Sequence, residues 1–211
     1  MFVKSYCSSI SGIEAVTVAV EVNITAGIGM YLVGLPDNAV RESQERIRAA
    51  FENCEYKMSG KKVVVNLSPA DLRKEGSAYD LPIAVAMLAA SGQIDAAPLS
   101  RYVLLGELSL DGSILPVKGA LPIAMQALKE GFAGIILPEE NAREAAVVKG
   151  LDVYGIGNLR EVVNFLQGFT NLTPARINLD ETFTEAQQSF DGDFCDVKGQ
   201  AQVKRALEVA A

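Results

Sequence analysis

The chain has 211 residues, 49% of them hydrophobic and 21% charged, with a formal net charge of −7 and no histidine. This length suits one domain, or one domain with a tail, and the hydrophobic fraction predicts a sizeable core. The missing histidine excludes Ser-His-Asp and Cys-His catalysis and His-type zinc sites within the chain. The acidic net charge argues against binding of nucleic acid by this chain alone.

No stretch approaches the ~18 consecutive uncharged apolar residues of a membrane span, so no membrane partner is predicted. Residues 1–6 begin with strand-like alternation and do not resemble a signal peptide, and we therefore expect a cytoplasmic protein. The three cysteines, Cys7, Cys54 and Cys195, are far apart and form no Cys-x-x-Cys pair. We expect these thiols to be buried or to have no chemical role, and we expect no metal site.

The first two predicted elements after this start are strands. Residues 13–24 alternate between an apolar and a more polar side, which is typical of a half-buried strand. Gly27 and Gly29 then turn the chain into residues 30–33, which we predict to be the second strand of the same hairpin. No helix begins directly after these glycines, so they form a turn and not a dinucleotide-binding loop.

A helix, a strand and a second helix follow. Asp37 is the predicted N-cap of the first helix. Its inward stripe consists of residues at helical spacing, namely Val40, Gln44, Ile47, Phe51 and Cys54. Residues 63–67 read as a short buried strand. Residues 79–91 are apolar almost all round, which predicts a central helix.

The second half alternates strands and helices. Asp111-Gly112 is the strongest hairpin signal in the chain and predicts a strand pair within residues 102–117. The following predicted elements are helix 121–129 with Gly131 at its end, strand 134–137, helix 139–149, strand 151–156 and helix 159–166. This alternation favours parallel strands, whereas the first half favours hairpins. We therefore predict an α+β fold with a mixed sheet covered by helices.

Charge is distributed unevenly along the chain. Residues 41–74 contain eight basic and five acidic side chains, a local charge of +3, whereas residues 178–196 contain six acidic and no basic ones. The weakly basic stretch is read either as a binding face or as ordinary solvated helix surface. From these patterns we predict a domain at residues 1–169, an acidic linker at 170–193 and a separate segment at 194–211.

The last segment resembles the opening of an AAA+ ATPase module. Residues 196–200 read Asp-Val-Lys-Gly-Gln, and in that family such a turn precedes a short helix near the adenine base. The resemblance implies that Val197, Gly199 and Gln200 lie near the adenine in a longer protein that uses ATP and Mg²⁺. No G-x-x-x-x-G-K-[ST] loop is present, so we expect no cofactor in this chain and read it as the front part of a larger ATPase.

Three further stretches carry a second resemblance. They are residues 74–84 (KEGSAYDLPIA), residues 105–121 (LGELSLDGSILPVKGAL) and residues 134–141 (GIILPEEN). In order and spacing they resemble the proteolytic domain of Lon proteases. They resemble more closely the N-terminal, Lon-like domain of the magnesium-chelatase-related AAA+ family of the ComM/YifB type, and this resemblance covers nearly the whole chain.

Lon proteases use a Ser-Lys dyad, which needs no histidine. Aligning Gly76 with the Lon pattern places Ala78 at the serine position, and aligning residues 115–117 places Leu121 at the lysine position. Both groups of the dyad are therefore missing, and the resemblance implies a non-proteolytic domain without catalytic residues.

A shifted pair, Ser77 with Lys118, is a weaker alternative. Ser77 is displaced by one residue, about 100° around a helix. It is also explained structurally as the N-cap of a capping box with Asp80, or as a loop residue if the helix begins at Asp80 to accommodate Pro82.

Glu107 is expected to be structural. With Asp111 it forms a possible carboxylate pair, but other glycosidase-type residues are not identified.

The chelatase-related resemblance implies an ATP-driven hexameric ring that remodels DNA by branch migration during natural transformation (competence) or recombination. This domain would position the substrate or assemble the ring. Its partners would be its own AAA+ module, neighbouring subunits and branched or single-stranded DNA. The alternatives are a protein-interaction domain of a chaperone-like AAA+ ATPase, metal insertion into a tetrapyrrole, and peptidase activity.

Overall fold

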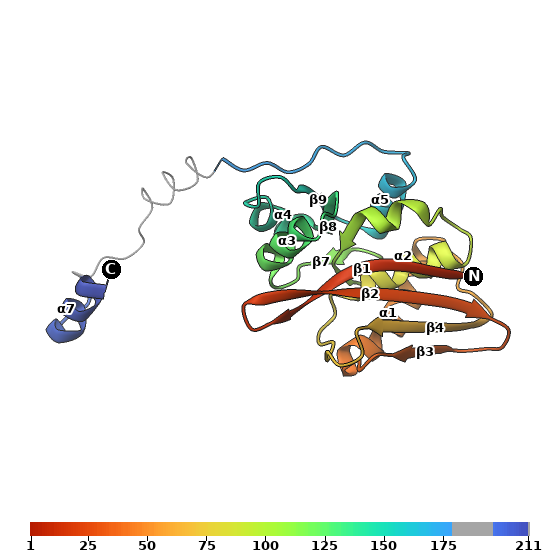
Figure 1. Ribbon diagram of the computed structural model, residues 1–211, viewed down its shortest axis with the longest axis horizontal. Helices are drawn as coiled ribbons and strands as arrows, with labels where there is room; N and C mark the ends of the chain where they lie inside the picture. The colour runs from red at the N-terminus through yellow and green to blue at the C-terminus, as the bar shows by residue number, and fades with distance from the viewer. Residues whose placement is uncertain (179–195, 211) are drawn as a thin grey trace. The chain divides into compact units, whose positions relative to one another are not determined.

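The computed structural model describes residues 1–178 and 196–210, and the chain divides into two units, Met1–Arg176 and Ile177–Ala211, which are treated separately (Figure 1). The first unit contains a seven-stranded mixed sheet in the order β3-β4-β2-β1-β5-β8-β9. Its strands are β1 (Phe2–Ser11), β2 (Glu14–Thr25), β3 (Met30–Val33), β4 (Lys62–Ser68), β5 (Tyr102–Leu104), β8 (Gly134–Pro138) and β9 (Asp152–Ile156). A separate two-stranded sheet is formed by β6 (Glu107–Leu108) and β7 (Ile114–Leu115). The predicted α+β fold with a mixed sheet is confirmed.

The strand pairing corrects one prediction. β3 is not the hairpin partner of β2, because β4 lies between them, antiparallel to β2 and parallel to β3. The reason is the connection from β3 to β4, which runs through the helix α1 (Asn38–Asn53). A helical crossover of this kind joins parallel neighbours, so β3 pairs with the strand that follows it in the chain. The hairpin of the first half is instead formed by β1 and β2.

The predicted strand pair within residues 102–117 is shorter than expected. Its first three residues form β5, which pairs in parallel with β1 and β8 in the main sheet. Only β6 and β7 form the antiparallel pair around Asp111-Gly112. The parallel arrangement of β5, β8 and β9, predicted from the alternation of strands and helices, is confirmed.

The helices match the predicted pattern, except that the helix predicted at residues 139–149 ends at Ala145. They are α1, α2 (Asp80–Ala90), the 3-10 turn η1 (Ala97–Arg101), α3 (Ala120–Lys129), α4 (Glu139–Ala145) and α5 (Leu159–Leu166). All eleven residues of α2 are buried, as its all-round apolar sequence predicts. The Asp37 side chain caps α1 by accepting from the Val40 N–H at 2.8 Å, which confirms the predicted N-cap. In the inward stripe of α1, Gln44 is only half-buried, and Ser43 is buried beside it.

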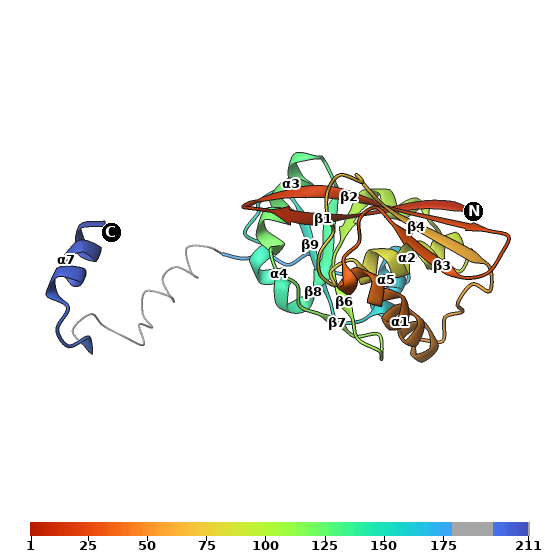
Figure 2. The ribbon, with the colours of Figure 1, turned by 90° about the horizontal axis from the view of Figure 1, so that it is seen from below.

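The helices form two layers around β1 and β2. Figure 2 shows α1, α2 and α5 on one side of these strands and α3 on the other. Ser5 faces the first layer, since its hydroxyl donates to the Pro82 carbonyl at 2.9 Å. Ile10 faces the second layer, where it packs against Gly119 at the start of α3. The two residues lie on opposite faces because side chains alternate along a strand.

The first unit ends beyond the predicted domain boundary at residue 169. Ala175 donates its N–H to the Val153 carbonyl at 2.8 Å, and Arg176 pairs with Asp152 at 2.8 Å. Residues up to 176 therefore belong to the unit because they bond to β9. Most of the predicted acidic linker, from residue 179 on, lies outside the described residues. Among residues 1–178 and 196–210, no helix is long and apolar enough to cross a membrane.

A lysine is buried within the first unit, in the segment that leads to α2. Lys74 is completely inaccessible to solvent, and its ammonium donates to the carbonyl of Pro69. Burial lowers the pKa of Lys74 from its ordinary value of 10.5, with Asp71 and Cys7 opposing the change. Burial conversely raises the pKa of the Cys7 thiol. The charged form of this lysine is thus disfavoured in the folded state.

We expect stability to depend on pH through Lys74. Since the folded state releases this proton more easily than the unfolded state, the free energy of unfolding should rise as the pH increases from the depressed pKa of Lys74 toward 10.5. In Lys74→Met this part of the rise should disappear, whereas the exposed Lys57→Met should retain it. Urea midpoints measured between neutral and alkaline pH test this, and parallel curves for wild type and Lys74→Met would contradict it.

Candidate functional site

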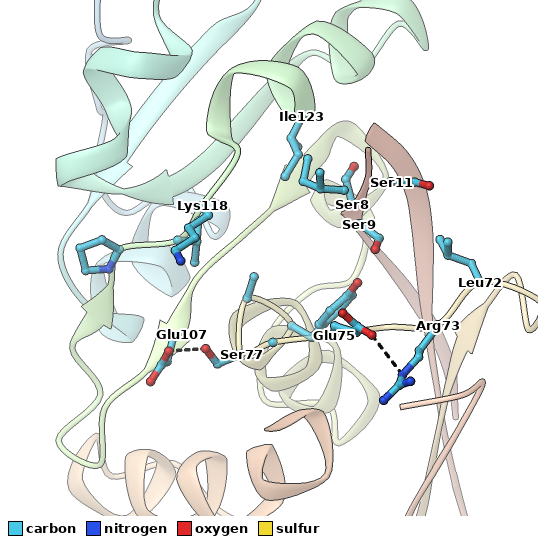
Figure 3. A pocket seen from close by; sticks show the side chains of 16 residues that line it. Ser8, Ser9, Ser11, Leu72, Arg73, Glu75, Ser77, Glu107, Lys118 and Ile123 are labelled. Carbon is cyan, nitrogen blue, oxygen red and sulfur yellow. Dashed lines mark hydrogen bonds and ion pairs between the residues drawn. The ribbon is translucent and has the colours of Figure 1, made fainter. Parts of the chain in front are cut away.

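A pocket of about 710 Å³ lies where three distant parts of the sequence meet (Figure 3). Its walls come from the end of β1, from the segment before α2 (Leu72, Arg73 and residues 75–79), and from residues 116–118 before α3. Glu107 of β6 and Ile123 of α3 complete the lining. Two of the three stretches that carry the Lon-like resemblance thus contribute to one cavity.

Ser77 lies in a loop at the wall of this pocket. Its hydroxyl hydrogen-bonds to the carboxylate of Glu107, as Figure 3 shows. The capping-box interpretation of Ser77 and Asp80 is wrong, because α2 begins at Asp80 and Tyr79 at the N-cap makes no side-chain cap bond. The alternative start at Asp80 is confirmed. It places Pro82 in the first helical turn, where a missing N–H is tolerated.

The Asp80 carboxylate is used for a buried ion pair. It accepts from Arg46 Nε at 2.6 Å and from Arg46 Nη2 at 2.9 Å, and it also accepts from the Leu108 N–H at 3.1 Å. Burial raises the pKa of the Asp80 carboxyl, and the Arg46 guanidinium opposes this rise. The pair ties α1, the start of α2 and β6 together. Because Ser77 lies just before α2 in the chain and Glu107 belongs to β6, the pair holds one wall of the pocket in place.

The two positions aligned with the Lon dyad differ in their relation to the pocket. Ala78 lines the pocket. Leu121 is not among the lining residues, and its backbone N–H donates to Glu144 at 3.0 Å. For the shifted pair, Ser77 and Lys118 both line the pocket, but the hydrogen bond of Ser77 goes to Glu107. Lys118 is exposed. That this chain has no peptidase activity stays a prediction.

Two buried hydroxyl groups in the pocket wall were not identified from the sequence. Tyr79 is 1% exposed and Ser8 is 4% exposed, and neither hydroxyl has a hydrogen-bond partner among the described residues. Burial raises the pKa of Tyr79, and the nearby Ser9 side chain opposes the rise. A buried hydroxyl without a partner is costly, so these groups are suited to a ligand that brings hydrogen-bonding atoms into the pocket. The Ser8-Ser9 pair, polar residues at the end of an otherwise alternating strand, is the one sequence signal that points to them.

The charges of the pocket are balanced. Arg73 pairs with Glu75 at 3.1 Å, and Glu107 and Lys118 supply one further charge of each sign. Asp111 does not join Glu107 there; it lies in the β6–β7 turn, where it accepts from the Ser113 N–H at 2.9 Å. This bond lowers the pKa of Asp111. The two carboxylates therefore have separate local roles and do not form a catalytic pair.

The second unit contains the turn that resembles an ATPase opening. Gly199 and Gln200 have φ values of 75° and 53°, and α7 (Ala201–Ala210) begins immediately after them. The Gln200 carbonyl accepts from the Lys204 N–H at 3.0 Å, the first turn of this helix. Val197 is 43% exposed, and no residue of α7 is buried. The position of Val197, Gly199 and Gln200 near an adenine stays a prediction.

Metal coordination finds no support in the described part of the chain. Residues 1–178 and 196–210 contain no group of three or more Asp, Glu or Cys side chains arranged to hold a metal ion. Cys7 and Cys54 are free and buried. Cys195 lies outside the described residues. The arrangement as a whole is that of a pocket lined by both polar and apolar side chains.

Comparison with known proteins identifies the family. Residues 20–141 match the family model described as "Subunit ChlI of Mg-chelatase". The competence protein ComM of Haemophilus influenzae is 39% identical over 211 residues, which cover 98% of this chain and 40% of that protein. The uncharacterized protein YifB of Escherichia coli is 41% identical over 201 residues, 95% of this chain and 38% of that protein.

A Lon protease is a more distant relative. The enzyme of Brevibacillus choshinensis is 28% identical over 161 residues, 70% of this chain and 20% of that protein. The chain spans about two fifths of the length of the first curated relatives it matches, 41% in the mycobacterial protein Rv2897c. These matches extend across both sequence resemblances, and the chain belongs to the Mg-chelatase-related family of the ChlI subunit, together with ComM and YifB.

Proposed function

We propose that this chain is the Lon-like, non-proteolytic domain of an AAA+ ATPase that remodels DNA, and that it positions the substrate or assembles the ring. The observation that carries this proposal is the pocket. Ser8 and Tyr79 place buried hydroxyls in its wall, but alanine occupies the position aligned with the Lon nucleophile, residue 78, and Ser77 is bonded to Glu107. Such a site is built to bind and not to cleave.

The turn at residues 196–200 supports the ATPase part of the proposal. A left-handed Gly199-Gln200 turn followed at once by a helix without buried residues suits the opening of a further module that would cover this helix. In the complete protein Val197, Gly199 and Gln200 would approach the adenine of ATP, and Mg²⁺ would accompany the nucleotide. The ring would be a cytoplasmic hexamer.

The name of one relative supports the DNA part. ComM of H. influenzae is called a competence protein, and competence is the uptake of DNA for natural transformation. We therefore propose ATP-dependent branch migration during transformation or recombination as the process, with branched or single-stranded DNA as the partner.

A protein-interaction domain of a chaperone-like ATPase is the second candidate. The net charge of −7 and the balanced charges of the pocket favour a protein ligand at this site over a nucleic acid.

We expect four-way-junction DNA to stimulate ATP hydrolysis by the full-length protein, and deletion of residues 1–176 to reduce this stimulation several-fold while basal hydrolysis persists. The physical reason is that the domain either holds the DNA or aligns the subunits for their response to it. Steady-state ATPase assays with and without junction DNA test this. Stimulation that survives the deletion would overturn the role of the domain, and no stimulation of the intact protein would favour the protein-interaction candidate.

A further inference from the structure

One face of the main sheet is only partly covered. α3 packs on β1 and β2 near their shared turn, and Phe132 contacts Tyr6 edge-on at 5.3 Å. Toward the other end of β1, the outward residues Phe2 and Lys4 are exposed; in Figure 1, β1, β2 and β4 lie in front there, with α2 behind them. We call this region the open sheet face and define it by its outward residues: Phe2, Lys4, Glu21, Asn23, Val64, Asn66, Tyr31 and Val33.

The strand register places two exposed aromatic rings in one row of this face. Phe2 lies opposite Asn23, Asn23 opposite Val64, and Val64 opposite Tyr31. Phe2 is 57% exposed and Tyr31 51% exposed. The rings are three strand spacings apart, roughly 14 Å. One extended polymer can therefore place separate planar groups on the two rings.

One lysine lies beside each of these rings. The Lys62 ammonium lies 5.0 Å from the Tyr31 ring centre, and the Lys4 ammonium lies 5.8 Å from the Phe2 ring centre. At the same end of the sheet, a shallow groove between the amino terminus and the residues that follow α2 brings Lys57 and Lys61 to the margin of this face. The result is a concentration of positive charge on a chain whose net charge is −7.

The acidic residue of this face is already neutralised. Glu21 pairs with Lys4 at 2.8 Å and accepts from the Asn66 amide at 2.9 Å, and these contacts lower the pKa of Glu21. The lysines at positions 57, 61 and 62 have no salt bridge among the described residues. Their charge therefore remains available to a ligand.

We propose that the open sheet face binds single-stranded DNA, with Phe2 and Tyr31 stacking on bases and Lys57, Lys61 and Lys62 contacting phosphates. This rests on the proposed function and names the surface and the form of DNA it takes. Aromatic rings flanked by cations hold single strands of any sequence, since every base has a stacking face. A duplex keeps its bases stacked inside, and a flat sheet face does not enter its grooves, so the surface favours the single strand.

The aromatic pair provides the first test. We expect the 211-residue chain to bind a short fluorescent oligothymidylate at low salt, measured by anisotropy. The double variant Phe2→Leu/Tyr31→Leu keeps apolar side chains but loses both stacking rings, and its affinity should fall about tenfold or more. The matched control is Phe169→Leu, which removes a 79% exposed ring outside this face and should leave binding unchanged.

The lysines provide an independent test through salt. In Lys61→Gln/Lys62→Gln the slope of log affinity against log salt should become shallower by about 1.4, because two phosphate contacts to a single strand are lost. The variant Lys129→Gln/Lys149→Gln alters two exposed lysines outside the open sheet face and has the same net charge, so its slope should equal that of wild type. Thermal unfolding of each variant shows that the fold is kept.

Several outcomes would overturn the proposal. These are no oligothymidylate binding by the chain at low salt, equal losses in test and control variants, or tighter binding of duplex than of single strand. A change in oligomeric state of Phe2→Leu/Tyr31→Leu with unchanged DNA affinity would make the face a subunit interface instead.

The two proposals fail separately. The full-length protein could show junction-stimulated ATP hydrolysis while these substitutions leave its DNA binding unchanged. That result would contradict DNA binding by the open sheet face but would support the proposed function. If the open sheet face binds DNA but junction DNA does not stimulate ATP hydrolysis, the face proposal stands and the proposed function is contradicted.

Discussion

Replacing Arg46 by methionine should lower the free energy of unfolding by about 3–5 kcal/mol, because it leaves a buried carboxylate without its counter-ion. Asp80 is fully buried, and Arg46 supplies two of its three hydrogen bonds, at 2.6 and 2.9 Å. The same guanidinium donates to the Ala39 carbonyl at 2.9 Å, so α1 would also lose an internal bond. Urea unfolding of the chain, followed by circular dichroism, measures the change.

A second ion pair on the same helix serves as the control. Arg48 is 47% exposed and lies 3.4 Å from Glu45, so Arg48→Met should cost less than about 1 kcal/mol. In the double variant Arg46→Met/Asp80→Leu both charges are gone, and much of the lost stability should return. Equal unfolding midpoints for Arg46→Met and Arg48→Met would show that the buried pair contributes no more than a surface one.

Gly34→Ala should be similarly destabilising, by roughly 3–5 kcal/mol, the sum of backbone strain and overpacking. Gly34 has a φ of 99°, and a Cβ atom there would overlap the carbonyl oxygen of Leu67 and lie 2.9 Å from its nitrogen. Leu67 is part of β4, which is paired on both sides, so its backbone cannot move away. The substitution therefore strains the connection between β3 and α1.

Gly92 separates the two causes. Its φ is 78°, but a Cβ there would meet no atom within 4 Å. Gly92→Ala should thus cost only the backbone term, about 1 kcal/mol. If both alanine variants unfold at the same denaturant concentration, the close approach of Gly34 to β4 does not contribute to stability.

Local periodicity was enough to predict most helices and the strands of the second half. The all-round apolar run at residues 79–91 identified the buried α2, and Asp37 identified the start of α1. These features depend on neighbouring residues in the chain, which the sequence shows directly. The partner of β3 could not be predicted in this way. It depends on where the chain emerges from α1, which places β4 beside β3.

Some features of the candidate site could likewise be predicted from the sequence, and others could not. The positions of Ala78 and Leu121 within the Lon-like stretches could be read from the sequence, and so could the family, because both depend on residue types in a fixed order. The sequence did not show that Ser77 bonds to Glu107, or that Asp80 pairs with Arg46 and does not cap the helix. It also did not show that the buried hydroxyls of Ser8 and Tyr79 lie in one pocket.

The open sheet face shows most clearly which features only the tertiary structure determines. Phe2, Lys4, Tyr31 and Lys62 belong to strands separated by up to sixty residues, and nothing in their spacing connects them. They became one surface because the order β3-β4-β2-β1 aligns them in register and because α3 covers only the far end of the sheet. The sequence alone determined most of the elements and the family. The tertiary structure decided which side chains meet, since contact between distant residues depends on strand order and packing, which no local pattern encodes.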